Sequence, residues 1–177
     1  MKNYIVIQFI FLLFLNFASF SQVDKTDIFS IARSGSLTDL KEILEDKPEL
    51  IDQKNLAGYT PLILACYSGN NQVAKYIVDR TNTINLNNGY GTALMASVVK
   101  ANEELVNYLL EHDADVNVSD ANGTTALHYA VIFNKSSIAE KLIKSNARFD
   151  LKDNRGNTAK DYAVLQNNKK LLTLFNN

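Results

Sequence analysis

Asp120-Ala-Asn-Gly-Thr-Thr-Ala-Leu-His-Tyr-Ala-Val131 is the stretch of sequence that decides the fold of this chain. Its central phrase is a threonine, then a small residue or proline, then a leucine, and the same phrase begins at Thr60 and Thr92, with a weaker copy at Thr158. Successive threonines are 32, 33 and 33 residues apart. Self-similarity at this period indicates stacked supersecondary units, none of which can bury its apolar face alone.

Each of these threonines stands where a helix should begin. A threonine hydroxyl can accept a hydrogen bond from a free amide of the first turn, and Pro61 suits that turn because it has no amide to leave unpaired. Apolar residues at helical spacing then recur further along, for example over residues 105–110, and indicate a second helix. Small residues in the first helix would allow close packing between units, at Ala65-Cys66, Ala96-Ser97 and Ala130-Val131.

Turns that carry Asn or Asp before Gly separate the units, and one second helix is followed by Asp113-Ala-Asp-Val-Asn117. With these features the chain resembles ankyrin-repeat proteins. The resemblance implies an all-α repeat solenoid of paired antiparallel helices with projecting β-hairpin loops, in about five units that include degenerate caps. The expected units are residues 25–54, 55–86, 87–119, 120–152 and 153–177.

Three residues or segments carry specific structural expectations. The turn before Thr92 contains two glycines and follows a short interval, so we expect a distorted hairpin tip there. Asp113 stands where the family usually has a glycine in the left-handed conformation. The resemblance further implies that His128 forms a hydrogen bond to the neighbouring hairpin.

The N-terminus has a different character. Lys2 is followed by a long apolar run and then by small residues that end at Ser21, which is typical of a secretory signal peptide. An uncleaved membrane anchor is the alternative, but polar residues interrupt the run, and it is shorter than the ~20 residues that a spanning helix needs. We therefore predict a signal peptide over residues 1–21, an ankyrin-repeat domain over residues 22–177, and no stable membrane anchor after cleavage.

Composition and motifs exclude several kinds of site. A formal net charge of −1 over 177 residues offers no electrostatic basis for binding nucleic acid. Cys66 is the single cysteine, so we expect a buried thiol and no intrachain disulfide. The segment from Asp113 to Thr124 begins like a calcium loop but lacks the required glycine and glutamate. The two histidines are interpreted as structural, and we predict no catalytic residue, metal or cofactor.

The resemblance implies that a partner binds to the hairpin tips and to the inner-helix face. The residues at those positions are Leu56, Ala57, Tyr59, Tyr67, Ser68, Tyr90, Val99, Lys100, Ala121, Asn122, Thr124, Ile132, Phe133, Asn154 and Arg155. Six of them form a predicted apolar stripe, namely Tyr59, Tyr67, Tyr90, Val99, Ile132 and Phe133. Such a stripe lowers solubility unless a partner covers it, although some of these side chains could instead pack between units.

These observations predict an exported, monomeric, non-enzymatic protein–protein interaction module. The signal peptide and the absence of disulfides favour a bacterial periplasmic protein. Exported bacterial members of the family look like protective or inhibitory partners of a cell-envelope enzyme or toxin. Two alternatives stay open: a secreted effector that binds host proteins, and an unrecognised hydrolase that uses acidic residues near the hairpins.

Overall fold

The computed structural model describes residues 24–175 of the chain. The signal peptide predicted over residues 1–21 therefore lies outside the described residues. Within the described range the chain forms α-helices and one 3-10 helix and contains no β-strand. The elements are α2 (Ile28–Ser34), α3 (Leu37–Asp46), the 3-10 helix η1 (Pro48–Asp52), α4 (Pro61–Ser68), α5 (Asn71–Val78), α6 (Ala93–Val99), α7 (Glu103–Glu111), α8 (Ala126–Ile132), α9 (Ser136–Lys144), α10 (Ala159–Leu165) and α11 (Lys169–Thr173).

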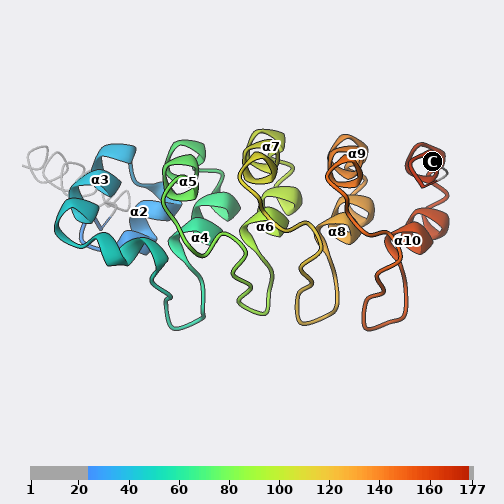
Figure 1. Cartoon of the computed structure of the whole chain (residues 1–177), viewed down its shortest axis with the longest axis horizontal. Coiled ribbons are helices and arrows are strands. Elements are labelled where there is room, and N and C mark those ends of the chain that lie inside the picture. Colours follow the sequence, from blue (N-terminus) through green and yellow to red (C-terminus); the bar gives the residue numbers. More distant parts are fainter. Residues whose placement is uncertain (1–23, 176–177) are drawn as a thin grey trace, which may run out of the picture.

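Consecutive helices pair, and the pairs stack side by side along the long axis of the molecule (Figure 1). The inner helices α2, α4, α6, α8 and α10 form one row, while α3, α5, α7 and α9 form a second row. The loops that precede α4, α6, α8 and α10 all project from the same side. This arrangement confirms the predicted all-α repeat solenoid.

The repeated threonines cap the inner helices as predicted. Each threonine side-chain oxygen accepts a hydrogen bond from the amide three residues later, at 3.2 to 3.4 Å. Pro61 occupies the first turn of α4, where its missing amide leaves no helical bond unmade. Helix starts could therefore be located from local chemistry, because a capping hydroxyl satisfies an amide that the helix itself cannot reach.

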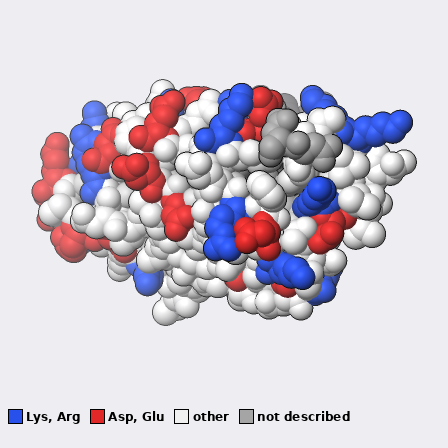
Figure 2. All heavy atoms as spheres, turned by 45° about the vertical axis from the view of Figure 1, so that its right-hand side comes forward, with Lys and Arg blue, Asp and Glu red and all other residues white. Residues whose placement is uncertain are grey.

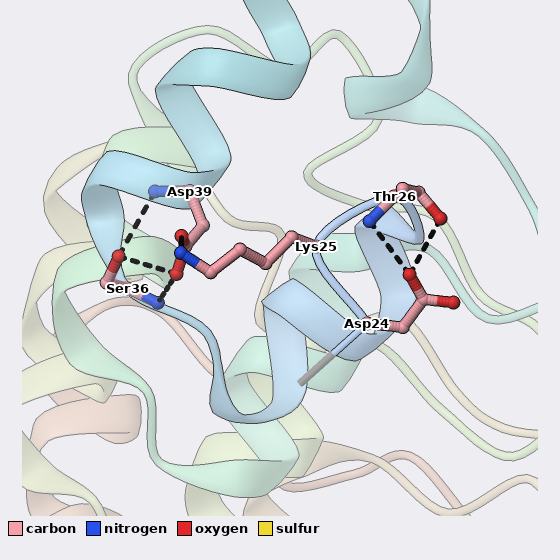
Figure 3. A network of polar contacts seen from close by, with 5 residues as sticks. All are labelled: Asp24, Lys25, Thr26, Ser36 and Asp39. Atoms are coloured by element: carbon pink, nitrogen blue, oxygen red, sulfur yellow. Dashed lines mark hydrogen bonds and ion pairs between the residues drawn. The ribbon is translucent and has the colours of Figure 1, made fainter. Parts of the chain in front are cut away.

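Polar contacts close the N-terminal end of the stack (Figure 3). Ser36 caps α3 and donates to Asp39 Oδ2 through its amide and its hydroxyl, at 3.0 and 2.7 Å. Lys25 Nζ lies 2.6 Å from Asp39 Oδ1. The contact with Lys25, followed by those with Ser36, lowers the pKa of Asp39 to about 2. This atypical first unit therefore links the segment before α2 to the second row of helices.

Close packing between inner helices depends on one small residue in each unit. Ala65, Ser97, Ala130 and Ala163 are fully buried, and each lies five residues after its capping threonine. The sequence prediction had aligned Ala96 with Ala65 and Ala130, and this alignment was wrong by one residue. Ser97 occupies the packing position, and its hydroxyl donates to the Ala93 carbonyl at 3.0 Å. Ala96 consequently has a different role, described below.

Each projecting loop turns around a side-chain acceptor. The Oδ1 atoms of Asn55, Asn88, Asp120 and Asp153 each accept two amides of their own tip, at 2.8 to 3.2 Å. The only β pairing in residues 24–175 consists of two isolated antiparallel bridges, Ser119 with Thr125 and Lys152 with Thr158. The projecting loops are therefore hairpins held by turns and short pairings instead of extended strands.

The hairpin before α6 departs from the others, as the expected distortion required, and the departure is a tip one residue shorter. Asn88 N donates to Gly91 O at 3.4 Å, whereas Asp120 N reaches the fourth residue along, Thr124, at 2.9 Å. Gly91 has a φ of 138°, and a Cβ on it would lie 2.9 Å from Met95 Sδ. A side chain at this position would therefore conflict both with the backbone and with the start of α6.

Neighbouring tips are joined to one another, and this fixes their positions. Ala121 N donates to Gly89 O at 2.9 Å, and Asn154 N donates to Asn122 O at 2.8 Å. His128 Nε2 lies 3.2 Å from the Asn157 carbonyl of the next hairpin, which confirms the contact expected for this histidine. These bonds hold the second, third and fourth tips to one another and α8 to the fourth hairpin.

Candidate partner-binding site

An apolar groove opens where the central inner helices meet the first two hairpin tips. Its volume is about 260 Å³. We call it the aromatic groove, and its walls are formed by Tyr59, Ile63, Tyr67, Asn88, Tyr90, Gly91, Thr92, Met95, Ala96, Val99, Tyr129 and Phe133. Because α4, α6, α8 and two hairpins all contribute, the groove exists only when consecutive units are stacked.

Aromatic rings dominate the walls of the groove. The Tyr59 and Tyr90 rings are parallel with centroids 6.1 Å apart, and Tyr129 and Phe133 form a second parallel pair at 6.1 Å. The exposed fraction is 74% for Tyr90, 54% for Tyr67 and 44% for Phe133. Large side chains exposed together in this way leave apolar surface that a binding partner could cover.

The groove borders a repeat position at which the two following units carry an aromatic ring and α6 does not. The fourth residue after each capping threonine is Leu64, Ala96, Tyr129 or Tyr162. Tyr129 OH donates to Asp120 Oδ2 at 2.6 Å, and Tyr162 OH donates to Asp153 in the same way. Burial, followed by the bond to Asp120, raises the pKa of Tyr129 to about 12. At Ala96 no side chain fills the corresponding volume, so α6 leaves a vacancy beside its hairpin.

The same vacancy leaves one hydrogen-bond donor unused. Asn88 occupies the position of Asp120 and Asp153, and its Oδ1 accepts the amides of Tyr90 and Gly91 at 3.0 and 3.2 Å. These two bonds fix the orientation of the side-chain amide. Asn88 Nδ2 is then buried without a hydrogen-bond partner among residues 24–175. A buried donor of this kind typically costs about 1–3 kcal/mol.

The residues predicted from the sequence divide between two hollows. Tyr59, Tyr67, Tyr90, Val99 and Phe133 all border the aromatic groove. The sixth member of the predicted stripe, Ile132, instead borders a second hollow of about 240 Å³, together with Asn122, Thr124, Asn154 and Arg155. Tyr129 stands between the two hollows and borders both.

The other predicted positions have varied surroundings. Leu56 and Ala57 are exposed on the first tip, and Ser68 and Lys100 are exposed at helix ends. Lys100 Nζ lies 4.7 Å from the centre of the Tyr67 ring, at the rim of the groove.

Two hairpin positions differ in how much surface they present. Ala121 is exposed, although its amide is used in the bond to the neighbouring tip. Thr124 is only 8% exposed, and its amide donates to Asp120 Oδ1, so it offers little surface to a partner.

Sequence reasoning missed several wall residues, namely Ile63, Asn88, Met95, Ala96 and Tyr129. Ala96 was missed because the sequence alignment, wrong by one residue, assigned it to the packing positions. Counting four residues from each capping threonine gives leucine, alanine, tyrosine and tyrosine, so the small side chain at Ala96 could have been recognised from the sequence.

Elsewhere the described residues provide little reactive chemistry. Cys66 is fully buried, and burial raises the pKa of its thiol to about 12, so it remains protonated and inert near neutral pH. Among residues 24–175, no group of three His, Cys, Asp or Glu side chains is placed to hold a metal ion. None of the helices in that range has the length and apolar character needed to cross a bilayer.

Charged side chains on the outer helices are partly paired between units. Lys75 Nζ lies 2.7 Å from Glu104, and Lys141 Nζ lies 3.5 Å from Glu103. Figure 2 shows acidic and basic side chains interspersed on the face in view, with no large area of one sign. Exposed pairs of this type contribute little stability, typically below about 1 kcal/mol each.

Comparison with known proteins places these features in a family. A sequence model described as "Ankyrin repeats (3 copies)" matches residues 28–120, and one described as "Ankyrin repeats (many copies)" matches residues 109–163. Among curated proteins, "Ankyrin repeat and SAM domain-containing protein 6" of Rattus norvegicus is 33% identical over 112 residues. That match covers 62% of this chain and 13% of the rat protein.

Two further relatives are named as enzymes. "Probable E3 ubiquitin-protein ligase XBOS32" of Oryza sativa subsp. japonica is 33% identical over 106 residues, which are 58% of this chain and 21% of the ligase. "Serine/threonine-protein kinase TNNI3K" of Mus musculus is 38% identical over 96 residues, 51% of this chain and 11% of the kinase. The chain thus matches only a small part of each relative. Its repeats, its capped inner helices and the matched family models together show that the chain belongs to the ankyrin-repeat family, whose repeats generally mediate binding to other proteins.

Proposed function

We propose that this protein is an exported, non-enzymatic binding module that acts as a protective or inhibitory partner of a cell-envelope enzyme or toxin. The aromatic groove is the observation that carries the binding role. It gathers exposed rings from three units on a face whose hairpins and helices are already fixed by hydrogen bonds. A fixed apolar surface suits protein recognition, because less conformational freedom is lost when the partner binds.

Export and the envelope role are supported by the sequence of residues 1–21, with its single lysine, apolar run and small residues before Ser21. The expected mature protein begins at Gln22 and lacks an anchor. N-terminal sequencing of protein isolated from the cell envelope tests this, and a sequence that begins at Met1 would contradict it. Recovery from the culture medium instead of the envelope would contradict the envelope role.

The binding role is tested by removing two rings of the groove. Aromatic anchors at the centre of an interface typically cost ~2 kcal/mol or more on truncation. The double variant Tyr67→Ala with Phe133→Ala should therefore lose the partner that the wild type captures from a native envelope extract, as identified by mass spectrometry. Both side chains are about half exposed and neither belongs to the buried core, so circular dichroism and the melting temperature should change little.

A matched control comes from an exposed aromatic residue outside the groove. Phe149 is 45% exposed, close to the 44% of Phe133, and it does not border the groove. The variant Phe149→Ala should keep full capture. Unfolding of the groove variant would assign its rings to the core, whereas a folded groove variant that still captures the partner would place the binding site elsewhere.

A further inference from the structure

The charge of the binding face differs from that of the whole chain. We define this face as the C-terminal ends of the inner helices together with the hairpin tips at residues 54–59, 87–91, 119–124 and 152–157. The exposed charged side chains on it are all basic, namely Arg33, Lys54, Lys100, Lys152 and Arg155. None of the five forms an ion pair within the described part of the chain.

The acidic residues of the same face are withdrawn from its surface. Asp120 is 6% exposed and Asp153 is 9% exposed. Their carboxylates accept hydrogen bonds from their own tips and from Tyr129 and Tyr162. The binding face is therefore basic although the whole chain has a net charge of −1, because the exposed acidic residues lie elsewhere on the molecule. A partner segment that carries carboxylates would be complementary to this face.

The vacancy at Ala96 defines the shape and polarity of the occupant. In α8 and α10 the same volume holds a tyrosine whose hydroxyl reaches the hairpin residue. In α6 the ring is absent, and the hairpin residue Asn88 presents an unpaired donor instead of an acceptor. An occupant with an aromatic ring and an oxygen acceptor would fill the volume beside Ala96 and would give Asn88 Nδ2 a hydrogen-bond partner. The Tyr90 side chain is largely exposed, so its ring can rotate toward solvent to admit the ring of the occupant while the backbone bonds of the tip stay in place.

We propose that the aromatic groove takes a tyrosine side chain from an acidic segment of the partner. The tyrosine ring fills the volume left by Ala96, and its phenol oxygen accepts a hydrogen bond from Asn88 Nδ2. Flanking carboxylates pair with Lys100 at the rim and with other basic groups of the binding face. This inference rests on the proposed function, since it specifies the partner that the same groove binds.

The first test is a peptide selection that makes no assumption about which residues bind the groove. A phage-displayed library of random peptides is selected on the purified protein, and peptides synthesised from enriched sequences are measured by fluorescence anisotropy. Enriched peptides should carry tyrosine with neighbouring Asp or Glu. Replacing that tyrosine by phenylalanine should weaken binding about threefold to tenfold, the range expected for one lost hydrogen bond. Enrichment of basic or non-aromatic sequences, or no enrichment, overturns the proposal.

The second test fills the vacancy from within. The variant Ala96→Tyr with Asn88→Asp reproduces the tyrosine–aspartate pair of the two following units, so it should melt at a higher temperature and bind the selected peptides about tenfold more weakly or worse. Asn88→Asp alone is the matched control. It keeps the turn bonds at Oδ1 and can accept the phenol hydroxyl, so it should still bind. Full binding by the folded double variant overturns the proposal.

Charge reversal provides a third test and separates this proposal from the proposed function. Lys100→Glu should weaken peptide binding severalfold at low salt and less at high salt, whereas Lys169→Glu, which makes the same charge change on α11, should not. If envelope capture depends on Tyr67 and Phe133 but is indifferent to Lys100→Glu, the acidic partner is wrong and the binding role stands. If capture is indifferent to the two rings, the binding role itself fails.

Discussion

Two equivalent turn positions should respond in opposite directions to exchange of glycine and alanine. Gly69 follows α4 with a φ of 73°, and Ala101 occupies the matching place after α6 with a φ of 55°. Both lie in the left-handed region, where a Cβ is unfavourable and where Asn134 and Asn167 stand in later units. Ala101→Gly should therefore stabilise the protein, and Gly69→Ala should destabilise it.

The magnitude follows from two opposing terms. A left-handed non-glycine residue costs roughly 1–2 kcal/mol, while glycine loses about 0.4–1 kcal/mol more through the entropy of the unfolded chain. The net effect is about 0.5–1 kcal/mol in each direction, equivalent to a shift in melting temperature of about 1–4 °C for a domain of this size. An added Cβ at Gly69 meets nothing within 4 Å, so the backbone conformation alone sets the effect there.

Thermal and urea denaturation followed by circular dichroism measure both variants. The double variant Gly69→Ala with Ala101→Gly serves as the control, because its two effects should largely cancel and leave the unfolding midpoint near that of the wild type. The reasoning is refuted if Gly69→Ala stabilises the protein, or if both single variants shift the midpoint in the same direction.

Two further predictions concern Asp113 and His128. Asp113 has the left-handed φ of 62° expected from the sequence, so Asp113→Gly should raise the melting temperature slightly, and a lower value would reveal an unrecognised contact of its side chain. Burial lowers the pKa of His128 below its ordinary 6.5, because the charged imidazolium loses its contact with water. Protonation at Nδ1 would also remove the bond that this atom accepts from the Thr125 amide. The stability that this neutral imidazole contributes is present above about pH 6.5 and is lost as the pH falls below it, so His128→Gln should reduce the drop in melting temperature between pH 7 and pH 5; an unchanged drop would assign it to other groups.

The basic side chains of the binding face would allow a near-neutral chain to select its partner by charge, as proposed above. Net charge sums all residues, whereas a partner meets only the side chains on the face that it covers. Asp120 and Asp153 contribute to the sum but expose few atoms to a partner, because the turns and the tyrosines occupy their oxygens. The prediction that the protein does not bind nucleic acid was made from the net charge of the whole chain, and it stays a prediction.

Much of the fold could be predicted from the sequence because its determinants are local. A capping threonine, the small residue of an inner helix and the turn around Asn or Asp each act within a few residues, and the period repeats them. For the same reason, the left-handed conformation of Asp113 and a distortion of the tip before Thr92 could be expected from the sequence, although the form of that distortion, a shorter tip, could not. The contact of His128 with the next hairpin was also expected, since stacked units place equivalent positions one repeat apart.

Only the tertiary structure decided where the groove lies and what lines it. Its walls come from three units, and Ala96 borders it at the position where Tyr129 and Tyr162 supply a ring in their own units. Periodicity identifies positions that face the same side, but it does not say which side chains leave a space or which donor remains unpaired. Those properties depend on the packing of neighbouring units around Asn88, and packing is set by the summed shapes of residues that are distant in the sequence.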